Sequence, residues 1–152
     1  MSFFSILLKK ILVFSIKLRY NINVANYQST RKKETENMNI LYKLNVTNHK
    51  DLYDLTKSPA IKKMSSIEGE TRSIDCAVIY EDMKHDGEIQ KILSFRCKES
   101  GEIFATNSPT FIQDFEDARD MIKEFNEEIH TIRVEGSTSR NGRHFISCVY
   151  VD

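Results

Sequence analysis

The sequence predicts a mainly β domain: a five-stranded barrel with one helix between the third and fourth strands, preceded by short helical turns. Three observations support this fold class. Residues 74–106 hold three short runs rich in strand-forming residues, in which apolar and polar side chains partly alternate. From Pro109 onward apolar residues recur every three or four positions, as in an amphipathic helix. Residues 131–151 alternate again around Asn141-Gly142, a pair typical of hairpin turns.

The first three strands are predicted over residues 74–81, 88–98 and 102–106. On the second of them Leu93, Phe95 and Cys97 share one face, because successive side chains of a strand point to opposite sides. We expect this face to be buried. The last two strands are predicted over residues 131–136 and 144–151, joined by a hairpin turn.

A helix is predicted over residues 109–127, with Ser108 as its N-cap and Pro109 in its first position. Its expected buried face consists of Phe111, Ile112, Phe115, Ala118, Met121, Ile122 and Phe125. Its expected solvent side carries Asp114, Glu116, Asp117 and Asp120. Upstream, residues 39–46 predict a strand or an extended lead-in, and residues 51–57 and 60–65 predict two helical turns.

The charges divide the chain into a basic head and an acidic body. Residues 1–37 carry seven Lys or Arg against two acids, which leaves 15 basic and 20 acidic residues, a net charge of −5, in residues 38–152. A body with this charge does not attract nucleic acid over its whole surface. Any contact with phosphates must therefore come from a local patch.

Residues 1–37 have two interpretations. Lys33 and Glu34 can be encoded by AAG GAG, a ribosome-binding sequence that lies three codons before Met38. We therefore expect residues 1–37 to be upstream sequence read in frame, or a disordered basic leader, and residues 38–152 to form the domain. If the leader is translated, residues 1–20 could lie on a membrane as a basic amphipathic helix. Their longest uncharged apolar stretch is too short to span a bilayer.

Enzymatic chemistry finds no support in the sequence. It contains no GxSxG, HExxH or P-loop pattern, and the histidines show no metal-ligand spacing. The odd, widely spaced cysteines Cys76, Cys97 and Cys148 each lie in an apolar run, which predicts reduced core thiols in a cytoplasmic protein. We expect a protein that is not an enzyme and has no cofactor or metal.

Three strands, one helix and two strands is the order of the OB-fold, whose second and third strands and flanking loops bind oligonucleotides. Four stretches, SPAIKKM, DGEIQKILSF, GEIFATNSPTFIQDF and GSTSRNGRHFISC, together resemble the small single-stranded DNA-binding proteins of phages and mobile elements of low-GC Gram-positive bacteria. The resemblance extends from about Asp51 to the C-terminus. It implies an OB-like barrel that coats single-stranded DNA during replication or recombination in the cytoplasm of a bacterial host.

Two further possibilities concern partners. Replication proteins could dock on the acidic side of the helix, which runs from Asp114 to Glu128. Alternatively, the domain could be an OB-like protein–protein adaptor that does not bind DNA, because OB barrels serve many functions.

Single-strand binding requires cations that contact phosphates and aromatic rings on which bases stack. Arg96 and Lys98 are expected on the outer face of the second strand, opposite Phe95. Phe104 is a candidate for the exposed aromatic residue of the third strand, with a core position as its alternative, and Tyr80 is a second stacking candidate.

The loops supply the remaining candidates. Arg140 and Arg143 flank Asn141-Gly142 in a loop with several hydroxyl groups and no acid, which suits a phosphate clamp. Lys62 and Lys63 follow a predicted helix start at Ser58-Pro59 and are the last two candidate binding residues.

Overall fold

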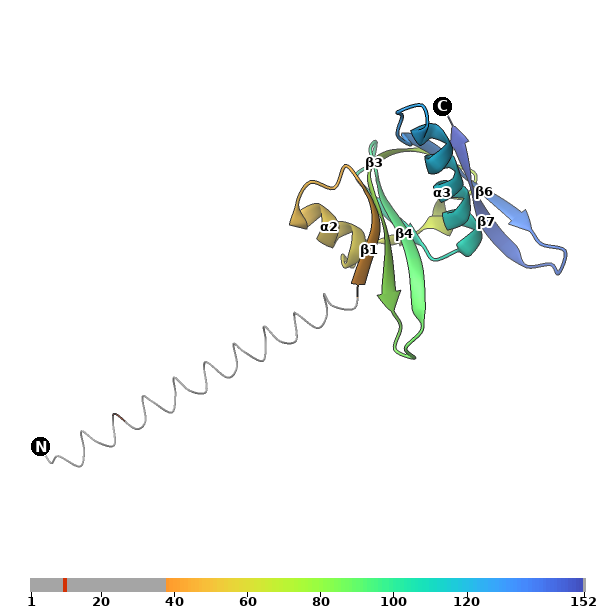
Figure 1. Cartoon of the computed structure of the whole chain (residues 1–152). Helices are drawn as coiled ribbons and strands as arrows, with labels where there is room; N and C mark the ends of the chain where they lie inside the picture. Colours follow the sequence, from red (N-terminus) through yellow and green to blue (C-terminus); the bar gives the residue numbers. More distant parts are fainter. Residues whose placement is uncertain (1–9, 11–37, 152) are drawn as a thin grey trace, which may run out of the picture. The chain divides into compact units, whose positions relative to one another are not determined.

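The computed structural model describes Lys10 and residues 38–151 (Figure 1). The expectations for residues 1–37 thus fall outside the described residues, apart from Lys10. Residues 39–152 form one compact unit. Within the described part of the chain, no helix is both long enough and apolar enough to cross a membrane.

The unit is mainly β, as predicted. Its elements in chain order are β1 (Met38–Leu44), α2 (His49–Thr56), β2 (Lys62–Lys63), a 3-10 helix η1 (Met64–Ile67), β3 (Thr71–Met83), β4 (Ile89–Cys97), β5 (Ile103–Thr106), α3 (Pro109–Lys123), β6 (Thr131–Thr138) and β7 (His144–Val151). The strands predicted from the alternating runs are all present. The prediction of five strands is too low, because β1 and β2 join the same sheet.

The strands form one curled, open sheet with the order β2-β5-β4-β3-β6-β7, and β1 also pairs with β3. β3 is the central strand: its first residues pair with β6 and the remainder with β4, all antiparallel. β2 lies parallel to β5, and β7 pairs with β6. The sheet therefore resembles a barrel that stays open between its terminal strands, β2 and β7.

The main core lies inside the curled sheet and under α3. Leu93, Phe95 and Cys97 are buried there, which confirms the predicted face of β4. Phe111 and Phe115 of α3 pack into the same cluster. The N-terminus of α3 is capped as predicted, because the Phe111 amide donates to Ser108 Oγ at 3.4 Å. All three cysteines are buried free thiols, also as predicted.

The predicted C-terminal end of α3 is wrong. The helix ends at Lys123 rather than at residue 127, and Asn126 adopts a left-handed conformation (φ 57°) that turns the chain. Phe125, which lies beyond the helix, is 71 % exposed, and Met121, which lies within it, is 67 % exposed, although both were expected in the core. Conversely, Asp114 is half-buried and accepts a hydrogen bond from the Cys148 amide at 3.2 Å.

A second, smaller apolar cluster lies on the outer face of β3 and β4. Residues 76–80 are all buried, so both faces of β3 are covered. α2 contacts β3 and β4, and its Leu55 is buried. Asn48 caps this helix by accepting from the Asp51 amide at 2.9 Å. The N-terminal part of the domain thus covers a face that the sequence analysis treated as open.

The helical turn predicted over residues 60–65 is wrong in part. Lys62 and Lys63 pair with Phe104 and Ala105 of β5, and only then does η1 begin. Met64 and Ile67 are both buried in the main core. Burial of these two side chains outweighs the local preference for a helix after Ser58-Pro59.

Candidate nucleic-acid interface

A groove lies between the β2-β5-β4 side of the sheet and β7. Its cavity has a volume of about 550 Å³ and is lined by residues of β2, η1, β4, β5 and β7 and by the residues that precede α3. Because β2 and β7 are the terminal strands of the sheet, the groove follows its open seam. A concave site of this volume is large enough for a small organic ligand or part of a longer one.

The groove combines apolar walls with polar groups. Met64, Ile92, Ala105 and Ile146 contribute apolar surface. Phe145 is the aromatic residue of the lining, and it is half-buried. On β7 the buried side chains are Ile146 and Cys148, so the pleat places Phe145 on the opposite face of the strand. Because Phe145 lines the groove and does not belong to the main core cluster, its ring is a candidate surface for stacking.

The groove continues towards the β3–β4 hairpin. Two further cavities, of about 350 and 480 Å³, share Gln90 with the first, and the smaller one also shares Asn107. The β3–β4 and β6–β7 hairpins project beyond the body of the sheet (Figure 1). An extended ligand could thus follow a continuous path between the two hairpins.

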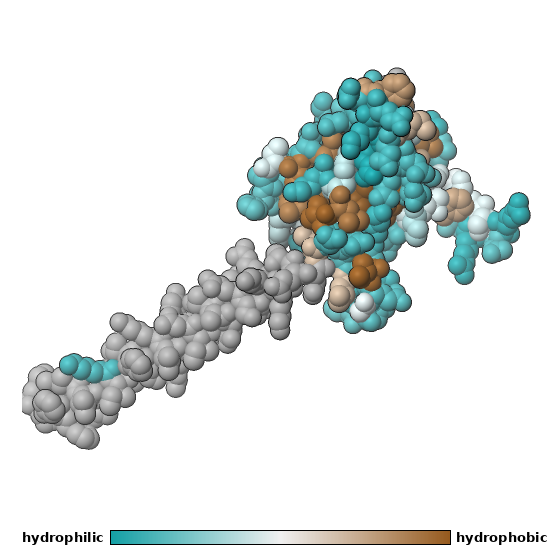
Figure 2. All heavy atoms as spheres, in the orientation of Figure 1, coloured by the Kyte–Doolittle hydropathy of each residue, from teal (hydrophilic) through white to brown (hydrophobic). Residues whose placement is uncertain are grey.

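Arg140 and Arg143 lie in the turn of the β6–β7 hairpin, next to the groove residue His144. The far end of this hairpin is hydrophilic (Figure 2). The turn is closed by hydrogen bonds from Ser139 N to Arg143 O (2.8 Å) and from Gly142 N to Ser139 O (2.9 Å). Gly142 has a φ of 77°, which few other residues adopt without strain.

Three of the predicted cations are free of ion pairs and lie at or next to the groove. Arg140, Arg143 and Lys63 are exposed, and within residues 38–151 no carboxylate pairs with any of them. Lys63 lines the groove itself. His144, by contrast, contacts Glu68 through an Nε2–Oε2 distance of 2.6 Å, which orients its ring at the edge of the groove. The local positive charge of this region therefore comes from Lys63, Arg140 and Arg143.

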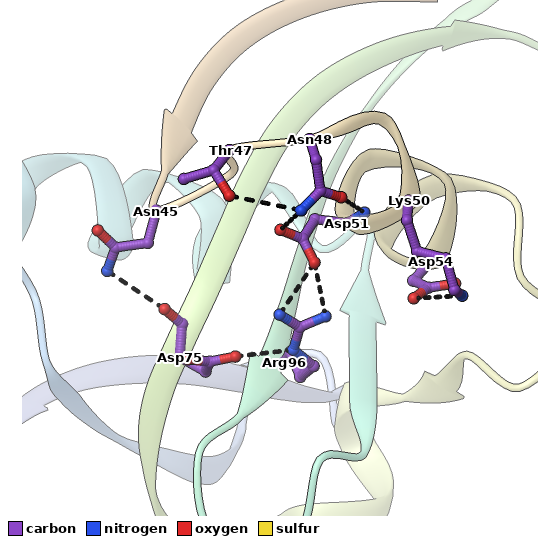
Figure 3. Close-up of polar contacts among 8 residues, drawn as sticks. All are labelled: Asn45, Thr47, Asn48, Lys50, Asp51, Asp54, Asp75 and Arg96. Carbon is purple, nitrogen blue, oxygen red and sulfur yellow. Dashed lines mark hydrogen bonds and ion pairs between the residues drawn. The ribbon is translucent and has the colours of Figure 1, made fainter.

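Arg96 does not belong to this site. Its Nε donates to Asp75 at 2.8 Å, and both terminal nitrogens donate to Asp51 of α2 at 3.1 Å (Figure 3). The hydrogen bond to Asp75 is the main cause that raises the pKa of Arg96 above its usual value. The guanidinium links α2 to the outer face of β3 and β4. The expectation that Arg96 would contact phosphates on this face is corrected, because its guanidinium is bound by the carboxylates of Asp51 and Asp75.

The two predicted stacking residues are buried. Phe104 is 1 % exposed and packs against Phe95, with the ring centroids 5.9 Å apart. Tyr80 is 4 % exposed, and its hydroxyl donates to the Thr56 carbonyl oxygen of α2 at 3.5 Å. Burial raises the pKa of Tyr80 to about 12. Neither ring offers a face to a base: Phe104 takes the core position that was its alternative, and the expectation that Tyr80 would stack on a base is corrected.

Lys62 and Lys98 also lie apart from the groove lining. Lys62 forms an ion pair with Glu102, whereas its neighbour Lys63 points to the groove. Lys98 is exposed but follows the C-terminal end of β4, where its amide donates to the Ser73 carbonyl oxygen at 2.9 Å. Of the eight residues expected to bind, Lys63 lines the groove, and Arg140 and Arg143 lie in the hairpin turn that precedes the groove residue His144.

Three residues of the groove lining were not predicted from the sequence: Phe145, Gln90 and Asn107. Phe145 could have been found, because the assignment of Cys148 to the core already places Phe145, three positions earlier on the same strand, on the other face. Gln90 and Asn107 carried no comparable pattern. Among the described residues, no group of three His, Cys, Asp or Glu side chains is placed to hold a metal ion.

Comparison of the chain with protein-family models, curated proteins and solved structures yields no match. The similarity to phage and mobile-element single-stranded DNA-binding proteins therefore stays a prediction that rests on four short stretches of sequence.

Proposed function

We propose that residues 38–152 form an OB-type domain that binds single-stranded DNA along the groove. The strand order supports this proposal. In an OB barrel the first strand pairs with the second and the fourth, and a helix commonly precedes the fourth. Strands β3, β4, β5, β6 and β7 have these pairings, and α3 lies between β5 and β6 in the chain. On this assignment β1, α2 and β2 are additions to the barrel.

The observation that carries the function is one half-buried aromatic ring in the groove together with three cations, at or next to the groove, that form no ion pair among the described residues. Stacking of a base on an aromatic side chain contributes about 1–3 kcal/mol and tolerates any base. Guanidinium and ammonium groups contact phosphates without reading the sequence. Phe145 would hold a base, and Lys63, Arg140 and Arg143 would hold the adjacent phosphates.

The proposed path differs from the one expected from the sequence. α2 covers part of the outer face of β3 and β4, and Asp51 neutralises Arg96 there. A DNA strand on that face would meet carboxylates, whereas at the seam it meets Lys63 and the arginine turn. The net charge of −5 in residues 38–152 makes such a local site necessary.

In this proposal the protein coats and protects single strands, as in phage or mobile-element replication, and catalyses no reaction. The test is a fluorescence-anisotropy titration of the full chain with a labelled oligo-dT at low and at moderate salt, with unlabelled duplex DNA as competitor. We expect binding that weakens as salt rises and that duplex DNA does not displace.

A pair of matched variants locates the site. Phe145→Ala removes the ring from the groove, and Phe125→Ala removes an exposed ring at the end of α3. We expect the first to weaken binding by about 5-fold to 150-fold, the range that corresponds to one lost stacking contact. The second should leave it unchanged. Absence of binding at low salt, or equal losses in both variants, would contradict the proposal.

A protein–protein adaptor is the second candidate. Met121 and Phe125 are large, exposed and about one helical turn apart, and Asp117, Asp120 and Glu124 lie around them. This surface suits a partner segment with apolar and basic side chains. A replication protein that docks here would have to carry such a segment. If oligo-dT does not bind, while Phe125→Ala abolishes capture of such a basic segment, the adaptor function would replace the DNA-binding one.

A further inference from the structure

His144 and Glu68 form a pair at the edge of the groove. Glu68 follows η1, and His144 is the first residue of β7 and lines the groove. Nε2 of His144 lies 2.6 Å from Oε2 of Glu68. The two side chains are 57 % and 37 % exposed, so both are accessible to solvent. The proposed function assigns no role to either of them.

The fold leaves room for this contact at Gly136 of β6. A Cβ atom at this position would overlap with Oε1 of Glu68 and press against Cε1 of His144. The residue after Glu68 is also tied to β6, because the Gly69 amide donates to the Val134 carbonyl oxygen at 2.6 Å. Glu68 is therefore held against β6, and the absence of a side chain at Gly136 lets its carboxylate reach the imidazole.

Contact with a carboxylate determines which ring nitrogen of His144 carries the proton. A carboxylate only accepts hydrogen bonds, so Nε2 must be the donor to Glu68. In the neutral ring the other nitrogen, Nδ1, then has a lone pair and can only accept. Within the described residues, Nδ1 has no hydrogen-bond partner. Because a phosphate oxygen also only accepts, the neutral ring cannot bind one.

The charges around His144 change when a DNA strand enters the groove. Its neighbours on β6, Gly136 and Thr138, are uncharged, and so are all lining residues of the groove other than Lys63 and His144 itself. The charged groups at or near the ring are one carboxylate and three cations: Glu68 after η1, Lys63 of β2, and Arg140 and Arg143 of the turn before β7. The cations oppose protonation of the ring, whereas Glu68 favours it. A phosphate that contacts the cations offsets their charge and so favours a protonated ring.

We infer that His144 is a further phosphate-binding residue, which takes up one proton from solvent when single-stranded DNA binds, and that Glu68 is its positioning residue. A protonated imidazole has two donors. In the complex Nε2–H donates to Glu68, and Nδ1–H, which carries the proton taken up, donates to a phosphate oxygen in a charge-assisted hydrogen bond. This inference rests on the proposed function and adds to it, because Lys63, Arg140 and Arg143 alone would bind phosphates without a change of protonation.

The test is the affinity of the full chain for labelled oligo-dT, measured between about pH 6 and pH 8 at constant ionic strength. Histidine is the side chain that ordinarily changes charge in this range. Because linkage between two ligands is reciprocal, a proton taken up on binding makes the affinity for DNA rise as the pH falls. A hydrogen bond to a charged group is worth about tenfold or more in affinity. We therefore expect oligo-dT to bind about fivefold more tightly, or better, at about pH 6 than at about pH 8.

Two variants separate the roles of the pair. His144→Gln cannot take up a proton and should bind oligo-dT with the same affinity at both ends of the pH range. Glu68→Gln replaces the carboxylate with an amide that can donate to Nε2, so a neutral ring can carry its proton on Nδ1. This variant should bind at about pH 8 at least as tightly as the wild-type chain, and it should lose the pH dependence.

Two other histidines provide matched controls. His49 belongs to α2, outside the groove, and His85 lines the cavity at the β3–β4 hairpin. His49→Gln and His85→Gln should both retain the pH dependence of the wild-type chain. Loss of the dependence in either control would assign the proton to that histidine and overturn the inference.

Two further results would overturn the inference while the proposed function stands. One is an affinity of the wild-type chain for oligo-dT that does not change with pH. The other is a pH dependence that survives in His144→Gln or in Glu68→Gln. Failure of the wild-type chain to bind oligo-dT at any pH would instead contradict the proposed function, and the inference with it.

Discussion

Removing both guanidinium groups of the β6–β7 turn, as Arg140→Ala/Arg143→Ala, should flatten the salt dependence of single-strand binding. Three cations that form no ion pair within residues 38–151 lie at or next to the groove: Lys63, Arg140 and Arg143. Each phosphate contact on a single strand contributes about 0.7 to the slope of log affinity against log salt. The wild-type slope is therefore about −2, and the double variant should have a slope of about −0.7.

These slopes give measurable differences in affinity. Between about 50 and 200 mM salt the wild-type chain should lose about 20-fold in affinity, and the double variant only about threefold. The assay is anisotropy titration of labelled oligo-dT over a series of salt concentrations. The slope reports the number of ionic contacts, so a general loss of folding does not imitate the expected change.

A charge-matched control removes two cations elsewhere. Lys43 of β1 and Lys123 of α3 are exposed and, within the described part of the chain, form no ion pair. Neither lines the groove. Lys43→Ala/Lys123→Ala should retain the wild-type slope. If both double variants flatten the slope equally, the ionic contribution is a diffuse property of the chain, and the assignment of phosphates to the arginine turn is wrong.

Further predictions concern the residues that the structure moves away from the site. Phe104→Ala should lower the free energy of unfolding by about 3–5 kcal/mol in urea titrations, and a change below about 1 kcal/mol would refute its core position. Arg96→Met should cost about 1.5–3 kcal/mol of stability, because charged hydrogen bonds to Asp51 and Asp75 are lost. It should leave oligo-dT affinity unchanged, and so should Lys98→Ala; a loss of affinity in either would restore the outer face as a binding surface. Burial raises the pKa of Cys76 to about 11 and that of Cys148 to about 12, above an ordinary value of 9.0. Their contribution to stability is complete below about pH 9 and declines above it, because the unfolded thiols then ionise first. Urea titrations at about pH 8 and pH 10 should show this decline, and Cys148→Ala should reduce it; an equal decline in that variant would assign it to other groups.

Local patterns predicted most of the strands and turns. The alternation in β4 identified Leu93, Phe95 and Cys97 as the buried face, because one face of a strand packs on the core. Asn141-Gly142 placed the last hairpin, since Gly142 supplies the positive φ of its turn. Such features depend on a few neighbouring residues, and the sequence contains them in full.

Features that depend on distant contacts were not predicted. The cover of α2 on the outer face of β3 could have been suspected, because residues 76–80 form a continuous apolar run rather than an alternating one. The end of α3 could not be deduced from periodicity, which continued through Phe125 although the chain turns at Asn126. The residues that line the groove could be identified only once the whole sheet was known, because β4 and β7, which both contribute to its walls, are more than 50 residues apart in the chain.

The most direct test of the account is photo-crosslinking of the full chain to oligo-dT that carries 5-iodouracil at single positions, followed by mass spectrometry of the crosslinked peptide. This chemistry favours aromatic side chains in contact with the base. A DNA strand held at the seam should crosslink to Phe145, and this crosslink should be competed by unlabelled oligo-dT and absent in Phe145→Ala. A crosslink to Tyr53 or another residue of α2, or to Phe125, with none on β7, would contradict it.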